Sequence, residues 1–234
     1  MCFLRQAAFL VCSFLVPGTQ NERERSDIVS SIYEKTIKNY HLLHPKLQKR
    51  YQLDESHTFS GTGTMSEISG GSFLVRMLLK LGVFFRCFFS ERGKDIPFTI
   101  QNRACLLNRE HTGIEWNRTF FFKGKNRYFD AIMVYDEKED RILDFFGKPH
   151  LLLSVLAFEA SADGSLTITS GKQWLLICGK RIALPKWLTG TSVVCETFDE
   201  SKNCFTIQVH VQNTILGTLF FYNGMFQEEE RESC

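Results

Sequence analysis

The sequence lacks the short motifs that mark several common enzyme classes. It contains neither a Gly-x-Ser-x-Gly nucleophile elbow nor a His-Glu-x-x-His zinc motif. Gly61 and Gly63 form a Gly-x-Gly pair, but the third glycine and the preceding apolar strand of a dinucleotide-binding turn are missing. No catalytic residue is therefore predicted. A non-enzymatic function is favoured, and a hydrolase or isomerase with an unrecognised site is kept as a minor alternative.

Metal-binding spacing is also missing. The chain has 8 cysteines, and none belongs to a Cys-x-x-Cys pair or to a Cys/His cluster with zinc spacing. Most of them lie in apolar runs, where a free cysteine behaves as a small hydrophobic residue. His41 and His44 have the spacing of a metal pair on a helix, but Pro45 ends that helix and no carboxylate follows at the right step. We therefore expect reduced thiols, no metal and no cofactor.

Charge of one sign is not in excess, and the apolar run near the N-terminus is short. The formal net charge is +2, so charge alone implies no nucleic-acid partner. Residues 7–16 form a run of about ten apolar residues, whereas a membrane-spanning helix needs about 20. This run suits a signal-peptide core, an uncleaved anchor or the remnant of a membrane segment. We expect a cytoplasmic or membrane-associated protein, and export is the less favoured alternative.

Phenylalanine, by contrast, is abundant. The chain has 22 phenylalanines in 234 residues, and so many large rings need either a thick core or an apolar cavity to face. A chain of this length can bury a core as one large domain. We predict an apolar N-terminal segment at residues 1–21, a single α+β domain at residues 22–227 and an acidic tail at residues 228–234.

Helical periodicity precedes strand periodicity along the chain. Apolar residues recur at helical spacing over residues 28–40, and Pro45 suits the first turn of a second short helix. Residues 59–65 form a candidate strand whose glycines permit close backbone approach or a bulge. From residue 95 onward, alternating segments are joined by tight turns. The predicted fold class is α+β, with N-terminal helices followed by a large, strongly curved antiparallel β-sheet or incomplete β-barrel.

Residues 72–89 are the most hydrophobic segment of the chain. Their charges, Arg76, Lys80 and Arg86, fall within roughly a third of a helix circumference, and three charges in so short a run argue against a membrane span. One interpretation is a core helix with a thin solvated stripe. The other is a helix that lies in a lipid interface or covers an apolar cavity, with its cations at the water boundary. The candidate membrane or lid residues are Arg76, Lys80, Phe84 and Phe85.

An arginine stands in the middle of the most apolar strand face. The alternation of residues 114–122 places Arg118 on one face with the apolar side chains of Ile114, Trp116, Phe120 and Phe122. A buried guanidinium must be paired or reach water, because an isolated buried charge is costly. Arg118 either forms a structural ion pair, with Asp130 on the next strand as the first candidate, or anchors the carboxylate or phosphate of a ligand. The candidate ligand-binding residues are Arg118, Trp116, Phe120, Phe122 and Asp130.

Several motifs occur in an order that resembles a known family. They are LHPKLQKRY at residues 43–51, GTGTM at 61–65, WNRTF at 116–120, LDFFG at 143–147, ALP at 183–185 and ILGTLFFYNG at 215–224. With these motifs the chain resembles the bacterial family called domain of unknown function 4166 over roughly residues 28–227. The resemblance implies domain boundaries, and it brings no activity and no catalytic residue with it.

These features together favour an uncharacterised bacterial domain that binds an apolar or amphipathic ligand, such as a lipid, or a membrane surface. The alternative is an accessory interaction domain with a filled core that docks onto a membrane or enzyme partner. The interior distinguishes the two, because an empty apolar cavity larger than about 300 Å³ favours a ligand site and a packed interior favours docking. No oligomeric state is predicted.

Overall fold

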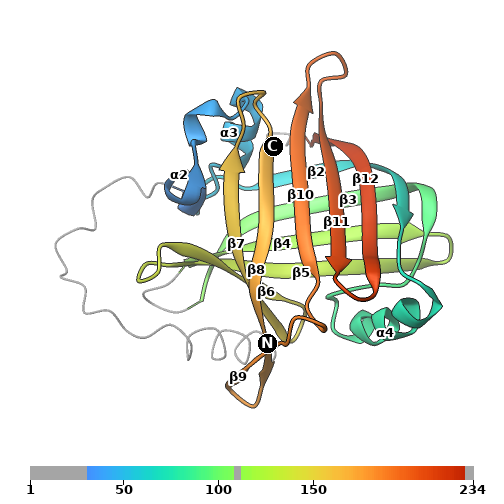
Figure 1. Ribbon diagram of the computed structural model, residues 1–234. Coiled ribbons are helices and arrows are strands. Elements are labelled where there is room, and N and C mark those ends of the chain that lie inside the picture. The colour runs from blue at the N-terminus through green and yellow to red at the C-terminus, as the bar shows by residue number, and fades with distance from the viewer. Residues whose placement is uncertain (1–30, 108–111, 230–234) are drawn as a thin grey trace.

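The computed structural model describes residues 31–107 and 112–229, which form a mostly β structure with few, short helices (Figure 1). The helical elements are α2 (Ile32–Thr36), the 3-10 helix η1 (Tyr40–Leu42), α3 (Pro45–Tyr51) and α4 (Phe73–Phe84). The strands are β1 (Ile37–Lys38), β2 (Phe59–Ser69), β3 (Gly93–Leu106), β4 (Thr112–Phe122), β5 (Lys125–Asp136), β6 (Arg141–Phe146), β7 (Leu152–Ala160), β8 (Leu166–Ile177), β9 (Lys180–Ala183), β10 (Thr191–Asp199), β11 (Cys204–Asn213) and β12 (Gly217–Glu228). The predicted N-terminal segment 1–21 and the end of the predicted acidic tail lie outside the described residues.

The strands of the described residues form one 12-stranded sheet that closes on itself. β1 and β9 lie outside the ring, which leaves ten strands in the order β2, β3, β4, β5, β6, β7, β8, β10, β11 and β12. All neighbours in the ring are antiparallel, and β12 pairs back to β2. The predicted antiparallel sheet is confirmed. The predicted open sheet or incomplete barrel is wrong, because the β2–β12 pairing removes the two edges that an open sheet would leave.

The N-terminal helices account for little of the structure, so the predicted α+β class is also corrected to mostly β. Of the helix predicted over residues 28–40, the described part contains the five-residue α2 and then β1. Ile37 and Lys38 of β1 pair in parallel with Phe158 and Glu159 of β7, and Ile37 is buried there. A short helix in isolation is marginal, and a contact with an existing sheet overrides the helical periodicity.

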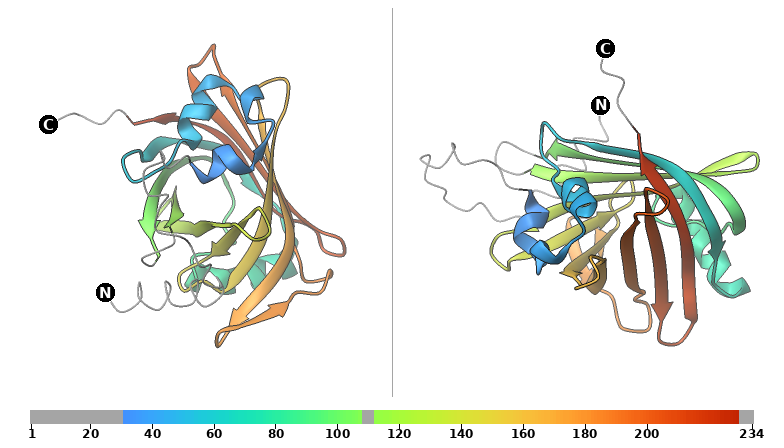
Figure 2. Two further views of the ribbon diagram at one scale, coloured as in Figure 1. Left: turned by 90° about the vertical axis from the view of Figure 1, so that its left-hand side faces the viewer. Right: turned by 90° about the horizontal axis from the view of Figure 1, so that it is seen from above.

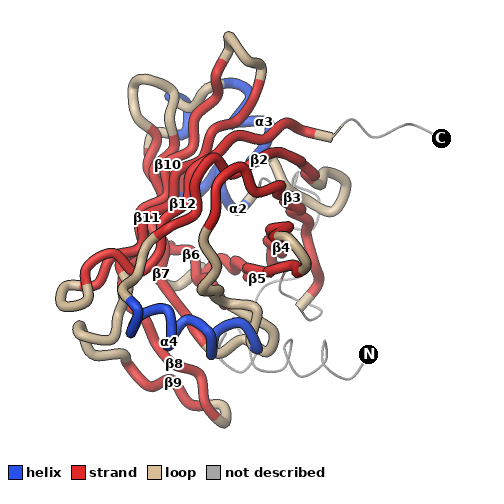
Figure 3. Tube along the Cα trace, turned by 90° about the vertical axis from the view of Figure 1, so that its right-hand side faces the viewer, coloured by secondary structure: helices blue, strands red, loops and turns tan. Residues whose placement is uncertain are grey.

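The helices lie at two ends of the barrel, α2 and α3 at one end and α4 at the other (Figures 2 and 3). At the α2–α3 end, which we call the floor, Tyr33, Leu47 and Tyr51 are fully buried. The Tyr33 and Tyr51 rings meet edge to face, with their centroids 5.0 Å apart. These aromatic and aliphatic side chains close the floor with apolar surface.

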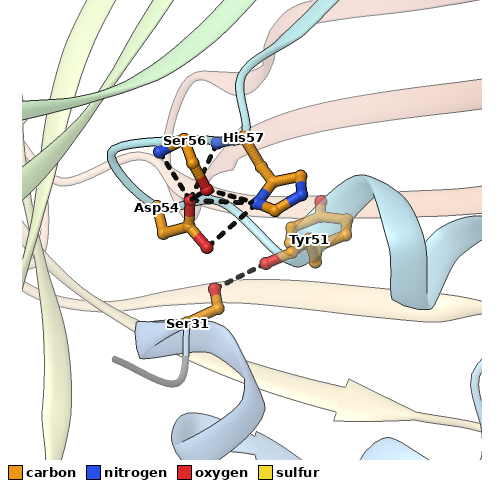
Figure 4. A network of polar contacts seen from close by, with 5 residues as sticks. All are labelled: Ser31, Tyr51, Asp54, Ser56 and His57. Carbon is orange, nitrogen blue, oxygen red and sulfur yellow. Dashed lines mark hydrogen bonds and ion pairs between the residues drawn. The ribbon is translucent and has the colours of Figure 1, made fainter. Parts of the chain in front are cut away.

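Hydrogen bonds tie the floor to the start of the barrel (Figure 4). Ser31 Oγ donates to the carbonyl of Tyr51 at 2.6 Å and so joins α2 to the end of α3. In the turn that leads to β2, Asp54 Oδ1 accepts the backbone N–H groups of Ser56 and His57 at 2.7 and 2.8 Å. This Asx-type turn fixes the direction in which the chain enters β2.

The seam between β2 and β12 depends on glycine. A Cβ atom on Gly63 would lie 2.0 Å from the carbonyl oxygen of Met225, and one on Gly224 would lie 2.3 Å from the carbonyl oxygen of Thr64. The register also shifts by a residue between Asn223 and Gly224. Close backbone approach, one of the two alternatives predicted for the β2 glycines, is therefore observed at Gly63, whereas the bulge lies beside Gly224 on β12.

Replacing Gly63 by alanine should open the seam. The added methyl group meets backbone atoms, which cannot rotate away, so we expect Gly63→Ala to lower the free energy of unfolding by at least about 2 kcal/mol. Gly171→Ala is the matched control, because its Cβ would have ordinary contacts, 3.6 Å from the nearest atom. Urea denaturation of both variants measures the difference, and equal stabilities would contradict the steric account.

Candidate functional site

The barrel encloses a cavity of about 350 Å³. Its wall is mostly apolar and includes Ile100, Phe129, Met133, Phe146, Ile168 and Val209. At the α4 end it is bounded by Trp187, Leu188 and Leu216, which are themselves exposed, so the cavity opens to solvent there. We call this end the mouth. The cavity volume exceeds the lower limit of about 300 Å³ for small-molecule sites.

Arg118 lies in this cavity. Both Arg118 and Trp116 on β4 line it, so the strand face that they were predicted to share points into the barrel at these two residues. The guanidinium stacks 4.0 Å from the centroid of the Phe129 ring, and its Nε donates to the Phe129 carbonyl at 3.1 Å. Only 8% of the residue is exposed, yet no carboxylate of the described residues forms an ion pair with it.

Asp130, the predicted partner of Arg118, faces the other way. The register places Asp130 opposite Asn117 and places Phe129 opposite Arg118, so the Asp130 side chain leaves the sheet on the outer face. There it forms ion pairs with Arg86 at 3.2 Å and Lys148 at 3.6 Å. The predicted Arg118–Asp130 ion pair is therefore wrong, and Asp130 does not line the cavity.

Asp144 on β6 is the carboxylate that does face the cavity near Arg118. It is 2% exposed, and its Oδ1 has no hydrogen-bond partner. Burial raises the pKa of its carboxyl to about 7, and the positive charge of Arg118 opposes this rise only in part. At neutral pH a large share of Asp144 is therefore protonated and can donate a hydrogen bond. The alternation of Ile142, Asp144 and Phe146 is the sequence signal that could have placed this residue inward.

A second buried arginine closes the floor of the cavity. Arg50 of α3 forms an ion pair with Glu196 of β10, and Glu196 lines the cavity. Glu196 also accepts a hydrogen bond from the Tyr51 hydroxyl at 3.0 Å. The Arg50 guanidinium lies within 6 Å of the ring centroids of Tyr51, Phe59, Trp116, Phe205 and Phe226. Sequence reasoning missed this pair, because α3 and β10 are far apart along the chain.

The remaining predicted ligand residues belong to the core instead of the cavity wall. The ring centroid of Phe120 lies 4.8 Å from that of Phe89 and 5.0 Å from that of Phe98, and Phe122 also packs on Phe89. Both are buried in the same apolar cluster, and neither lines the cavity.

The predicted lid helix lies at the mouth. Its observed bounds are Phe73–Phe84, shorter than residues 72–89, and it ends shortly after Gly82. Val75 and Leu79 line the cavity, whereas Arg76, Lys80 and Phe84 are exposed and Phe85 is half-buried. Its role as a lid or membrane helix stays a prediction.

Membrane-spanning helices and metal-binding clusters are two further features that could mark a site. Within residues 31–107 and 112–229, none of the helices combines the length and the hydropathy of a membrane-spanning segment. No group of three or more His, Cys, Asp or Glu side chains in the same residues is placed to hold a metal ion. The candidate site is the cavity, and the buried polar residues that line it are Arg118, Asp144, Ser154, Ser170, Glu196 and Asn213.

Fold and site together define a closed antiparallel barrel with a mostly apolar cavity, whose wall carries an arginine that no carboxylate of the described residues pairs with. Residues 43–226 match the family described as "Domain of unknown function (DUF4166)", and the chain belongs to that family. The chain is also 90% identical over 205 residues to "Uncharacterized protein YndH" of Bacillus subtilis (strain 168), an alignment that covers 88% of this chain and 100% of that protein. The resemblance inferred from the motif order is confirmed.

The Arg50–Glu196 pair should be essential for stability. Arg50→Met leaves a buried carboxylate without its partner, so we expect the free energy of unfolding to fall by about 3–5 kcal/mol. The adjacent Lys49 is the control, because its pair with Glu228 is exposed and Lys49→Met should cost less than about 1 kcal/mol. The double variant Arg50→Met/Glu196→Gln should recover part of the loss in urea denaturation, and strictly additive effects would contradict coupling.

The raised pKa of Asp144 makes stability depend on pH. The folded pKa of about 7 lies above the ordinary value of 3.8, so the folded state holds this proton more tightly and stability falls as pH rises from about 4 to about 7. Asp144→Asn removes the titration. As the pH rises through this window, the free energy of unfolding of the variant should therefore increase relative to that of the parent protein, by at most about 4 kcal/mol. The difference should level off above pH 7. Parallel stability curves for the two proteins from pH 4 to pH 8 would contradict this assignment.

Proposed function

We propose that the barrel binds one amphipathic molecule, with an anionic head at Arg118 and an apolar body in the cavity. The observation that supports this most strongly is the state of Arg118, a buried cation on the wall of an apolar cavity whose neighbours are a carbonyl, a ring and the Tyr222 hydroxyl, with no carboxylate of the described residues paired to it. A buried charge without a counter-charge is costly, and an anionic ligand would supply that counter-charge.

Asp144 supports a carboxylate as the head group. Its pKa of about 7 keeps much of it protonated at neutral pH, when it is a donor and not a second anion. A carboxylate between Arg118 and protonated Asp144 would accept hydrogen bonds from both. The same geometry disfavours a cationic head, which Arg118 would repel.

The cavity favours an extended aliphatic body. Its wall is apolar along most of its length, and its polar groups are few, which is the composition of small-molecule sites in general. A volume of about 350 Å³ also argues against the alternative of a filled core that serves only for docking. A fatty acid of medium or long chain has the required shape and charge.

The test compares two ligands that differ only in the head group. Dodecanoate binding should weaken at least about 10-fold in Arg118→Met, because a charge-assisted hydrogen bond contributes on the order of 1.5–3 kcal/mol. Binding of dodecanol, which lacks the charge, should change little. Displacement of a fluorescent fatty-acid probe measures both ligands, and native mass spectrometry of the purified protein looks for a retained lipid.

The controls distinguish loss of the ligand contact at Arg118 from a general loss of stability. Arg118→Met should keep the free energy of unfolding within about 1 kcal/mol, since no ion pair is broken. Arg141→Met removes a guanidinium from the outer side of β6, where it pairs with Asp136, and should leave binding unchanged. The proposal fails when Arg118→Met binds dodecanoate as tightly as the parent protein does.

A further inference from the structure

The mouth of the barrel exposes an unusual number of large apolar side chains. They come from three segments, α4, the β9–β10 loop and the β11–β12 turn, and we call them the mouth rim: Phe73, Leu74, Met77, Trp187, Leu188, Ile215 and Leu216. Their exposed fractions run from 37% for Leu216 to 79% for Phe73. A contiguous apolar cluster of this kind on a protein surface marks an interaction site.

The rim is held in place by a buried side chain. Asn213 donates through Nδ2 to the carbonyls of Trp187 and Thr189 at 2.9 and 2.7 Å. Its Oδ1 accepts the backbone N–H groups of Ile215 and Leu216, each at 2.9 Å. One amide therefore joins the β9–β10 loop to the β11–β12 turn, so the exposure of their apolar side chains is part of the folded structure.

Charge on the segments that carry the mouth rim has a single sign. The three segments that form the mouth, residues 70–90, 178–195 and 212–224, contain Arg and Lys but no Asp or Glu, although the chain has 26 acidic residues. The basic residues are Arg76, Lys80, Arg86, Lys180, Arg181 and Lys186. Arg76, Lys80 and Lys186 are exposed next to the rim. The partner that fits is apolar and anionic.

We infer that the mouth docks on an anionic membrane surface. α4 presents apolar side chains on two sides: Val75 is buried toward the barrel, and Phe73, Leu74 and Met77 point away from it. An apolar layer bordered by long basic side chains is the pattern of a segment that lies in a lipid interface, with the cations at the head groups.

The opposite end of the molecule carries charges of both signs. Near the floor, exposed carboxylates such as Glu34 and Glu200 lie among exposed lysines such as Lys35 and Lys202. An anionic surface therefore attracts the mouth, whose three segments carry only basic charges, more strongly than it attracts the floor. Docking does not require a filled cavity. Only the corollary, that a ligand enters from the bilayer through the mouth, rests on the proposed function.

Vesicle sedimentation tests the docking. The parent protein should bind vesicles of phosphatidylcholine and phosphatidylglycerol, and binding should fall in high salt and with phosphatidylcholine alone. Each cation near an anionic surface contributes about 5-fold to binding, so the triple variant Arg76→Glu/Lys80→Glu/Lys186→Glu should bind at least about 100-fold more weakly. Brominated lipid should quench the emission of the parent protein, and this quenching should be lost in Trp187→Phe.

A charge-matched control uses exposed lysines near the floor. Lys35→Glu/Lys46→Glu/Lys202→Glu changes the net charge equally and should bind vesicles nearly as the parent does. The triple variant at the mouth should still bind dodecanoate, and Arg118→Met should still bind vesicles, so failure of docking and failure of the ligand site are distinguishable. The inference would be overturned if the triple variants at the mouth and at the floor lost vesicle binding equally. It would also be overturned if the parent protein bound vesicles equally well with and without anionic lipid.

Discussion

Closure of the barrel along the β2–β12 seam is the constraint on which the other features of this protein depend. About eight strands make a ring that side chains can fill, and the ten strands here enclose more space than their inward side chains occupy. The closed ring is possible because Gly63 and Gly224 let two backbones approach where any side chain would strike a carbonyl. The cavity is therefore a consequence of strand number and of glycine at the seam.

The two buried arginines, Arg50 and Arg118, differ in whether the chain supplies a counter-charge. Arg50 has a carboxylate partner and a surrounding set of aromatic rings, so its cost of burial is largely compensated within the chain. Arg118 has one carbonyl, one ring and the neighbouring Tyr222 hydroxyl, and Asp144, which also faces the cavity, forms no ion pair with it and is only partly ionised at neutral pH. Arg50 has its counter-charge within the chain, although its Nε and Nη2 have no hydrogen-bond partner, whereas Arg118 would gain a counter-charge only from an anion that enters the cavity.

Local patterns in the sequence predicted the features that depend on neighbouring residues. Alternation in residues 114–122 placed Trp116 and Arg118 on the inner face, and the glycines at 61 and 63 indicated close backbone approach. Asp130 was assigned to the wrong face because alternation alone does not state which face of the next strand points inward.

Features that join distant segments could not be predicted in this way. Closure of the ring joins β2 to β12, and the floor pair joins Arg50 to Glu196. The short β1 replaced part of a predicted helix because β7, far along the chain, offers it a pairing edge. In each case the deciding contact involves a partner that no local window contains.

The order of strands around the ring has a consequence for synthesis of the chain. Most neighbours are consecutive hairpin partners and can pair as soon as both have left the ribosome, whereas β2 must wait for β12, the last strand of the described chain. Until translation reaches that strand, the nascent sheet has two free edges and an apolar concave face in contact with solvent or with chaperones. A chain truncated before β12 would keep those edges permanently. Pairing of β12 is therefore the step that removes the edges through which the chain could aggregate.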